Sequence, residues 1–208
     1  GLQVAARTRN NYRSKLVALF SFAQTQGYLP KNTDTAPQAL TKAKDQGGAI
    51  EIFTPEQMQT LLHAAQDDRI RVYLALGAFT GLRTAELQRL DWQDISLEHG
   101  HVEVKAGKAK TAQRRLVPIQ PNLRAWLEKE VQKSGPVFTR KSINHLVADS
   151  AREQGIEWPS NGMRHSYASY RLADCQDAPK VALEMGNSPQ IVFRNYRAVV
   201  SPSLAEQL

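Results

Sequence analysis

The stretch TGLRTAELQRL at residues 80–90 marks a change of direction between helices. Two amphipathic helices are expected before it, at about 55–66 and 69–80, because apolar residues recur there at helical spacing. Gly81 interrupts the second of these helices, and a short helix is expected to restart within the quoted stretch. Arg83 lies at the break, where its guanidinium can point into a cleft.

Downstream of this stretch the hydrophobic period changes. Residues 101–105 and 115–119 alternate between apolar and polar, and a turn rich in Gly and Lys separates them. This pattern predicts a β-hairpin or a small sheet. The predicted fold class is therefore α+β, mainly α-helical, with a small antiparallel β-sheet inserted between helices. Helices are expected to resume at about 121–133, 141–154, 162–173, 178–185 and 189–197.

Upstream, an amphipathic helix is expected over 7–28 and a polar linker over 30–49. A single amphipathic helix cannot bury its apolar stripe. We therefore expect 1–49 to be the end of a domain whose beginning is missing. The second domain, 50–208, starts with TPEQ at 54–57, where Thr can cap a helix, Pro can occupy its first position and Gln can close a capping box.

The composition is that of a globular protein. The 208 residues carry a formal charge of +7 and allow one full domain and a smaller piece. The one cysteine, Cys175, excludes an intramolecular disulfide and a cysteine-based zinc site. No apolar run approaches a membrane span, and no nucleotide-binding or metal-binding motif occurs, so we expect neither a membrane segment nor a cofactor. The positive charge suits a polyanionic partner but also suits many enzymes that never contact nucleic acid.

Basic residues gather around the predicted hairpin. Between residues 104 and 127 the sequence holds six Lys or Arg and no Asp or Glu. A hairpin tip with this charge can follow a groove and contact phosphates. The alternative is an edge strand whose lysines prevent aggregation. The six residues are Lys105, Lys108, Lys110, Arg114, Arg115 and Arg124.

Two further positions carry groups that suit phosphate chemistry. Arg164 lies early in a predicted helix, and with Arg83 it could hold both non-bridging oxygens of one phosphate. Tyr196 could be a covalent nucleophile, because Arg194 and Arg197 flank it and cations help a phenol to lose its proton. Taken singly, an arginine is more often a surface residue and a tyrosine is more often part of the core.

Together these segments resemble the tyrosine recombinase, or phage integrase, family. The resemblance covers about 50–200, and 7–28 resembles the last helix of the family's N-terminal core-binding domain. Four motifs in the family's order and at its usual spacing carry the resemblance: TGLRTAELQRL at 80–90, KT at 110–111 followed by RLVPI at 115–119, RHSYAS at 164–169, and MGNSP at 185–189 ahead of Tyr196.

The resemblance implies a role for each matched residue. Arg83 and Arg164 would bind the scissile phosphate, and Glu86 would support the first arginine. Lys110 would protonate the leaving 5′ oxygen, and Tyr196 would form a 3′-phosphotyrosyl bond. The expected DNA-binding residues are Lys105, Lys108, Arg114, Arg115 and Arg194.

Two positions depart from the family pattern. The family usually has His at the place of Asn161, and His or Trp at the place of Asn187. Asn can donate a hydrogen bond to a phosphate oxygen but cannot take up a proton at neutral pH, which leaves the general acid–base role at residue 161 open. His165 is the nearest titratable substitute, although the family's His at that place is usually a supporting residue.

By resemblance, the chain is a site-specific recombinase or integrase of bacterial or phage origin, acting on double-stranded DNA in the cytoplasm without a cofactor. The family's behaviour implies a tetramer on DNA, with 199–208 docked on a neighbouring subunit, and a monomer is expected without DNA. Three alternatives stay open: a non-catalytic DNA-binding relic, a type IB topoisomerase-like enzyme, and a helical module that binds another protein. Covalent adducts, supercoil relaxation and salt-dependent DNA affinity distinguish them.

Overall fold

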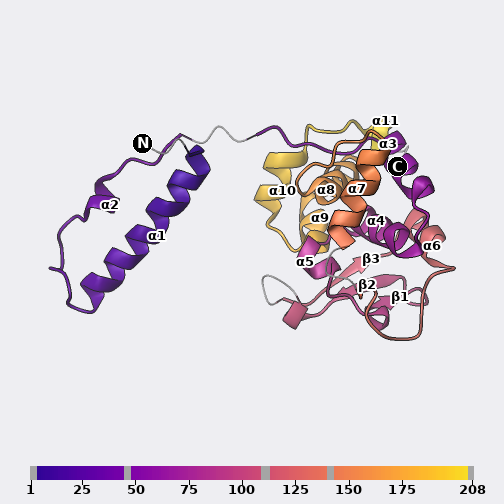
Figure 1. Cartoon of the computed structure of the whole chain (residues 1–208), viewed down its shortest axis with the longest axis horizontal. Helices are drawn as coiled ribbons and strands as arrows, with labels where there is room; N and C mark the ends of the chain where they lie inside the picture. Colours follow the sequence, from indigo (N-terminus) through magenta and orange to yellow (C-terminus); the bar gives the residue numbers. More distant parts are fainter. Residues whose placement is uncertain (1–3, 45–47, 109–112, 140–142, 206–208) are drawn as a thin grey trace. The chain divides into compact units, whose positions relative to one another are not determined.

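The chain divides into two compact units, Gly1–Ala49 and Ile50–Leu208 (Figure 1). The computed structural model describes residues 4–44, 48–108, 113–139 and 143–205. Among these residues, no helix is long and apolar enough to cross a membrane.

The first unit consists of helix α1 (Ala6–Thr25), a returning segment and the short helix α2 (Ala36–Ala39). The returning segment, which the sequence predicts to be a linker, is hydrogen-bonded along α1. The side chain of Asn10 exchanges two hydrogen bonds of 2.8 Å with the backbone of Ala43, and Arg13 Nε donates to the carbonyl of Leu40 at 2.6 Å. Leu16 and Leu19 of α1 remain exposed, Phe20 and Ala23 are half-buried, and no described residue of α1 is buried.

The second unit is mainly helical and includes a small antiparallel sheet, which confirms the predicted fold class. Its regular elements are α3 (Pro55–Ala64), α4 (Asp68–Thr80), α5 (Thr84–Leu87), η1 (Trp92–Asp94), β1 (Ile95–Ser96), β2 (His101–Val104), η2 (Ala106–Lys108), β3 (Arg115–Pro118), α6 (Pro121–Leu127), α7 (Ile143–Glu153), α8 (Gly162–Cys175), α9 (Ala178–Met185), α10 (Pro189–Tyr196) and α11 (Pro202–Ala205).

The sheet has the strand order β1-β2-β3 with antiparallel neighbours. Val102 pairs with Val117, and Val104 pairs with Arg115. Because side chains alternate across a strand, these four residues share one face of the sheet. The three valines are at most 1% exposed, so this face lies against the core. The hairpin expected from the alternating pattern is present, with the two-residue strand β1 added at its edge.

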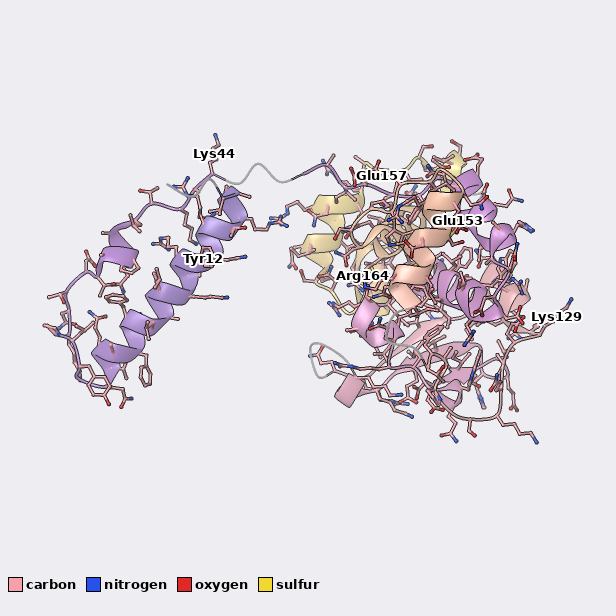
Figure 2. All side chains as sticks on the ribbon, in the orientation of Figure 1. Tyr12, Lys44, Lys129, Glu153, Glu157 and Arg164 are labelled. Atoms are coloured by element: carbon pink, nitrogen blue, oxygen red, sulfur yellow. The ribbon has the colours of Figure 1, made fainter. Side chains whose placement is uncertain are left out.

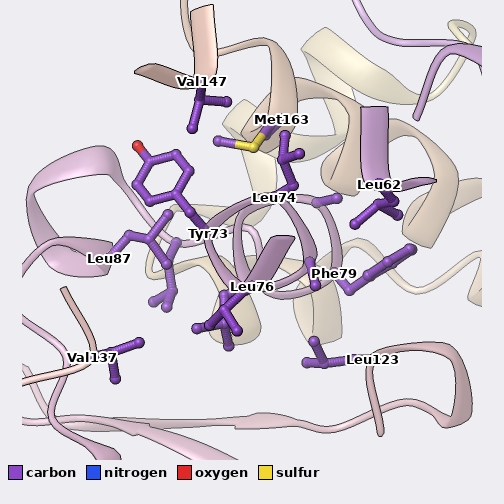
Figure 3. Packing of buried hydrophobic residues seen from close by; sticks show 14 of the residues in the cluster. Leu62, Tyr73, Leu74, Leu76, Phe79, Leu87, Leu123, Val137, Val147 and Met163 are labelled. Carbon is purple, nitrogen blue, oxygen red and sulfur yellow. The ribbon is translucent and has the colours of Figure 1, made fainter. Parts of the chain in front are cut away.

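Helix α4 forms the centre of the larger core. Every residue from Val72 to Thr80 is buried, which is the pattern of a helix covered on all sides. It contacts α3, α6, α7 and α8. Figure 3 shows Tyr73, Leu74, Leu76 and Phe79 leaving the helix in different directions.

A second cluster of buried residues joins α8, α9 and α10. Tyr167, Val181, Met185, Val192 and Tyr196 pack together in it. This cluster fixes α10 against α8 and α9, and therefore fixes the place of Tyr196.

Helices α1, α3 and α6 end earlier than the sequence predicts. Helix α6 ends at Leu127 rather than near residue 133, because the polar stretch after it forms turns and offers no further apolar face. Helix α5 ends at Leu87, and its last turn continues in tight i to i+3 hydrogen bonds up to Leu90.

Candidate active site

An abrupt helix end places Arg83. Helix α4 stops at Gly81, whose φ of +62° is left-handed and suits glycine. A Cβ at Gly81 would also overlap the ring of Tyr167, so packing excludes a side chain here. The chain then turns so that Arg83 caps α5, and its backbone N–H donates to the carboxylate of Glu86 at 3.0 Å.

Glu86 is the buried counter-charge of two arginines. Its side chain is 2% exposed, and it accepts hydrogen bonds from Arg83 Nη1 at 2.9 Å and from Arg115 Nη2 at 2.6 Å. Burial by itself would raise the pKa of Glu86, but the bonds from Arg115 and Arg83 outweigh burial and lower the pKa to about 2. Glu86 is therefore ionised at neutral pH and neutralises part of the positive charge of the arginines.

Arg164 lies in the first turn of α8, inside the second unit (Figure 2). Its Nη1 donates to the carbonyl of Met185 at 3.0 Å and to the carbonyl of Gly81. Burial, followed by repulsion from Arg83, lowers the pKa of Arg164 to about 10. The guanidinium remains protonated at neutral pH, but its charge is poorly solvated and would gain from an anion.

The three guanidinium groups meet at the C-terminal end of α9. The carbonyls of the successive residues 184–186 accept, in order, from Arg115 Nε at 3.0 Å, Arg164 Nη1 at 3.0 Å and Arg83 Nη2 at 2.6 Å. The last carbonyls of a helix lack partners within it and carry partial negative charge, so cations are stabilised there. The end of α9 thus brings together the two arginine motifs that are far apart in the sequence.

Tyr196 ends α10, and its hydroxyl lies 2.9 Å from Nδ1 of His165. Burial raises the pKa of Tyr196, and the charge of Arg164 opposes this rise. Burial, and then Arg164, lower the pKa of His165, so its imidazole is neutral at pH 7. With its proton on Nε2, the neutral imidazole accepts the hydrogen bond from the phenol at Nδ1. Nδ1 of His165 can therefore accept the phenol proton if Tyr196 acts as a nucleophile.

Asn161 and Asn187 occupy different settings. Asn161 is exposed, has a left-handed φ of +57° at the start of α8, and makes a long 3.5 Å bond to Ser160. Asn187 is half-buried between α9 and α10, and its Oδ1 accepts from the backbone of Ser188 at 3.0 Å. Its side chain therefore orders the turn that leads into the helix of Tyr196.

The basic residues of the hairpin have several carboxylate partners. Lys105 and Lys108 contact the two oxygens of Asp94 at 2.6 and 2.5 Å, and Asp94 is 1% exposed. Arg114 pairs with Glu103 at 2.5 Å on the exposed face.

The remaining predicted DNA-binding residues differ in exposure. The side chain of Arg115 is only 8% exposed and bonded to Glu86, so the structure places it in the interior of the unit and not on the exposed face of the hairpin. Arg194 is exposed on α10. Lys110 lies outside the described residues.

Comparison with known protein families identifies the family of the chain. The family model described as "Phage integrase family" matches residues 51–200, which is most of the chain. The chain belongs to the phage integrase family.

Several relatives of this integrase-family chain are tyrosine recombinases. It is 26% identical over 199 residues to tyrosine recombinase XerA of Thermococcus kodakarensis, covering 86% of this chain and 69% of the relative. It is 26% identical to XerA of Pyrococcus furiosus, covering 85% and 63%. The chain spans 38% of the length of another relative, from Escherichia coli strain K12.

Solved structures share the integrase fold. A lambda integrase dimer bound to a COC′ core site has a TM-score of 0.70 at 18% identity, covering 92% of this chain and 73% of that chain. The XerH site-specific recombinase bound to a palindromic difH substrate, in a post-cleavage complex, has a TM-score of 0.66 at 20% identity, covering 91% and 63%.

Three features of this integrase-family site are absent from the sequence-based prediction. They are the carbonyls at the end of α9, the inward orientation of Arg115, and the buried Asp94 behind the hairpin lysines. One signal could have revealed the second feature, because Arg115 and Val117 occupy the same face of an alternating strand. No group of three or more His, Cys, Asp or Glu that could hold a metal occurs in the part of the chain that the structure describes.

Proposed function

We propose that this chain cleaves and rejoins DNA strands in site-specific recombination, with Tyr196 as the nucleophile. The phenol oxygen attacks the scissile phosphorus, the bond from phosphorus to the 5′ oxygen breaks, and a 3′-phosphotyrosyl bond forms. The phenol proton passes to His165 and Lys110 supplies a proton to the leaving 5′ oxygen. Attack by the 5′ hydroxyl of a partner strand reverses the step, so bond energy is retained and no cofactor is needed.

One observation carries this proposal. The phenol of Tyr196 is bonded to His165, the neighbour in sequence of Arg164, and Arg164 is held with Arg83 at the end of α9. The charge of Arg164 also acts on the pKa of the Tyr196 phenol. These contacts support one site with a nucleophile, a proton acceptor and two guanidinium groups. The guanidinium groups can neutralise charge that develops on the phosphorane, which is the contribution that usually dominates catalysis of this type.

The proposed partner is double-stranded DNA. The neighbouring basic residues Lys105, Lys108 and Arg114 lie on the hairpin, and Arg194 lies on the helix of Tyr196. Both known recombinase structures described above contain DNA, and the lambda integrase among them is a dimer. We propose assembly on DNA as a tetramer, a monomer without DNA, and action in the cytoplasm of a bacterial host.

A second candidate is a DNA-binding protein of the same fold that no longer cleaves. The observation in its favour is Asn161, which is exposed at the start of α8 and cannot exchange a proton at neutral pH. This candidate requires that His165 does not replace the missing histidine.

Covalent trapping separates the two candidates. The protein is incubated with a pool of nicked duplexes of random sequence, in which a cleaved strand loses the short segment needed for religation. Denaturing gels should show a protein–DNA adduct with the wild type and none with Tyr196→Phe. Thermal unfolding and filter binding of the same pool test whether the variant remains folded and binds DNA.

Two outcomes would overturn the cleavage mechanism. Either the wild type binds the pool with steep salt dependence but forms no adduct, or Tyr196→Phe forms as much adduct as the wild type. The first outcome supports the non-catalytic candidate, and the second assigns the nucleophile to another residue.

A further inference from the structure

The end of α9 satisfies its backbone carbonyls in two distinct ways. The carbonyls of Ala182 and Leu183 accept from backbone N–H groups just beyond the helix, at 2.9 and 3.2 Å. The next three carbonyls, in the segment 184–186, accept from Arg115, Arg164 and Arg83. We call this set of three guanidinium groups on three successive carbonyls the arginine fan. It includes both arginines to which the proposed function assigns the phosphate.

Gly186 is the residue on which this arrangement depends. Its φ of +64° lies in the left-handed region, which glycine adopts without strain. A Cβ at this position would lie 3.0 Å from Nη1 and 3.1 Å from Cζ of Arg115. These distances are shorter than ordinary van der Waals contact, so Arg115 would have to move.

Any shift of Arg115 strains the bonds that hold it. Its Nε donates to the carbonyl of Glu184 at 3.0 Å, and its Nη2 donates to Glu86 at 2.6 Å. The side chain is 8% exposed, so water is not available to replace these bonds. A long side chain that could give way on a surface is therefore fixed at this site.

A displacement of Arg115 reaches Arg83 through Glu86. The carboxylate of Glu86 binds both guanidinium groups, at 2.6 Å on one side and 2.9 Å on the other. We propose that Gly186 and Arg115 are positioning residues of the recombination site. Because Gly186 has no side chain, Arg115 can lie against it. Arg115 then fixes the position of Glu86, and Glu86 fixes the position of Arg83. Arg115 thus acts on the strand-cleavage step from the interior and not by contact with DNA.

The proposal rests on the proposed function, and a matched pair of glycine variants tests it. Gly155 has a φ of +67°, nearly that of Gly186, and a Cβ there would meet nothing within 4 Å. Gly186→Ala and Gly155→Ala therefore introduce the same backbone strain, and only the first displaces Arg115. Both should lower the thermal midpoint, and Gly186→Ala should lower it more, because it also disturbs the buried bonds of Arg115.

The pair should differ in the cleavage step. In single-turnover trapping at saturating DNA, we expect Gly186→Ala to slow adduct formation by at least about tenfold, since misplacing groups by a fraction of an ångström weakens positioning. We expect Gly155→Ala to stay within about twofold of the wild type, as strain remote from the reacting groups does not alter positioning. The duplex DNA dissociation constant should change by less than about twofold in both variants, because Arg115 is not a phosphate contact.

A double-mutant cycle isolates the route through Arg115. In an Arg115→Ala background there is no guanidinium to displace, so adding Gly186→Ala should slow adduct formation by less than about threefold. Equal slowing in the two backgrounds would overturn the proposal, and so would wild-type cleavage by Gly186→Ala.

Absence of any adduct with the wild type would instead refute the proposed function. In that case hydrogen exchange followed by NMR tests the arginine fan. The Nε–H proton of Arg115 should exchange slowly with water in the wild type and in Gly155→Ala, and rapidly in Gly186→Ala.

Discussion

The imidazole Nδ1 of His165 and the phenol oxygen of Tyr196 lie 2.9 Å apart, although the two residues belong to different helices. The pKa of the imidazole is lowered by burial and by Arg164, and the pKa of the phenol is raised by burial. Both groups are therefore neutral at pH 7, and the pair is arranged for transfer of a proton from oxygen to nitrogen. Asn161 and Asn187 take no part in this pair.

We expect His165→Gln to slow adduct formation by about 10²- to 10⁴-fold, the usual contribution of a positioned general base. In the wild type the rate should rise with pH as His165 loses its proton, and the midpoint of this rise should lie below about pH 6.5, because burial and Arg164 lower the pKa of His165 from its ordinary value. The variant should lack this rising limb. His145→Gln, an exposed histidine on α7, is the control. An unchanged rate in His165→Gln would exclude the imidazole as the base.

Arg83→Ala should lose cleavage far more than DNA affinity. Removing one donor that stabilises a developing anion costs roughly 10²- to 10³-fold in rate, whereas one phosphate contact contributes only a small part of duplex affinity. Arg89→Ala, an exposed arginine just beyond α5, should leave both quantities nearly unchanged. Single-turnover trapping and a binding titration measure the two effects. Parallel losses of rate and affinity would contradict the role of Arg83 in the transition state.

Glu86 should make the stability of the protein depend on acid pH. The pKa of Glu86 is about 2 in the folded chain and about 4.5 without its partners. Its contribution to the free energy of unfolding is therefore complete above about pH 4.5 and is lost as the pH falls toward about 2. The loss amounts to about 3 kcal/mol.

Urea unfolding between pH 7 and pH 3 measures this dependence. Glu86→Gln should be less stable at neutral pH by about 3–5 kcal/mol, because it leaves the buried guanidinium of Arg115 and the half-buried guanidinium of Arg83 without their counter-charge. It should also show a shallower loss of stability in acid. Glu153→Gln, an exposed carboxylate on α7, should match the wild type in both respects. A wild-type acid dependence in Glu86→Gln would contradict the pKa assignment.

Asp94 should restrain the lysines of the hairpin. Burial would raise the pKa of Asp94, but the bonds from Lys105 and Lys108 lower it, so the carboxylate is ionised at neutral pH and competes with phosphates for both lysines. We expect Asp94→Asn to bind duplex DNA more tightly and to steepen the log–log salt slope by about one for each lysine that it frees. Asp149→Asn removes the same charge from an exposed pair with Arg152 and serves as the control. An identical gain in both variants would show that only net charge matters.

The sequence predicts much of the fold because local signals agree with each other. The capping box at Thr54 and Gln57, the helix end at Gly81 and the alternating strands occur as predicted. The close approach of Arg83 and Glu86 also follows from their spacing of three residues at a helix start. These features depend on neighbours in the chain.

The arrangement of Arg115 depends on contacts that are distant in the sequence. Charge alone does not tell which residues of a basic hairpin face inward, and the partner that draws Arg115 inward lies on α5. The sequence also does not predict which backbone carbonyls hold the arginines, because a sequence motif specifies side chains and not the main-chain atoms that orient them. Asp94 likewise precedes a strand without any pattern that connects it to the lysines.

The arginine fan has a consequence for protein engineering. The carbonyls that hold the three guanidinium groups belong to residues 184–186, and the same short span of chain continues through the turn at Asn187 into α10 and ends at Tyr196. One short segment therefore sets the spacing between the Tyr196 phenol and the carbonyls that hold the three guanidinium groups. Exchanging 184–196 as a block between homologous enzymes should transfer this spacing intact, whereas grafting the tyrosine alone should not.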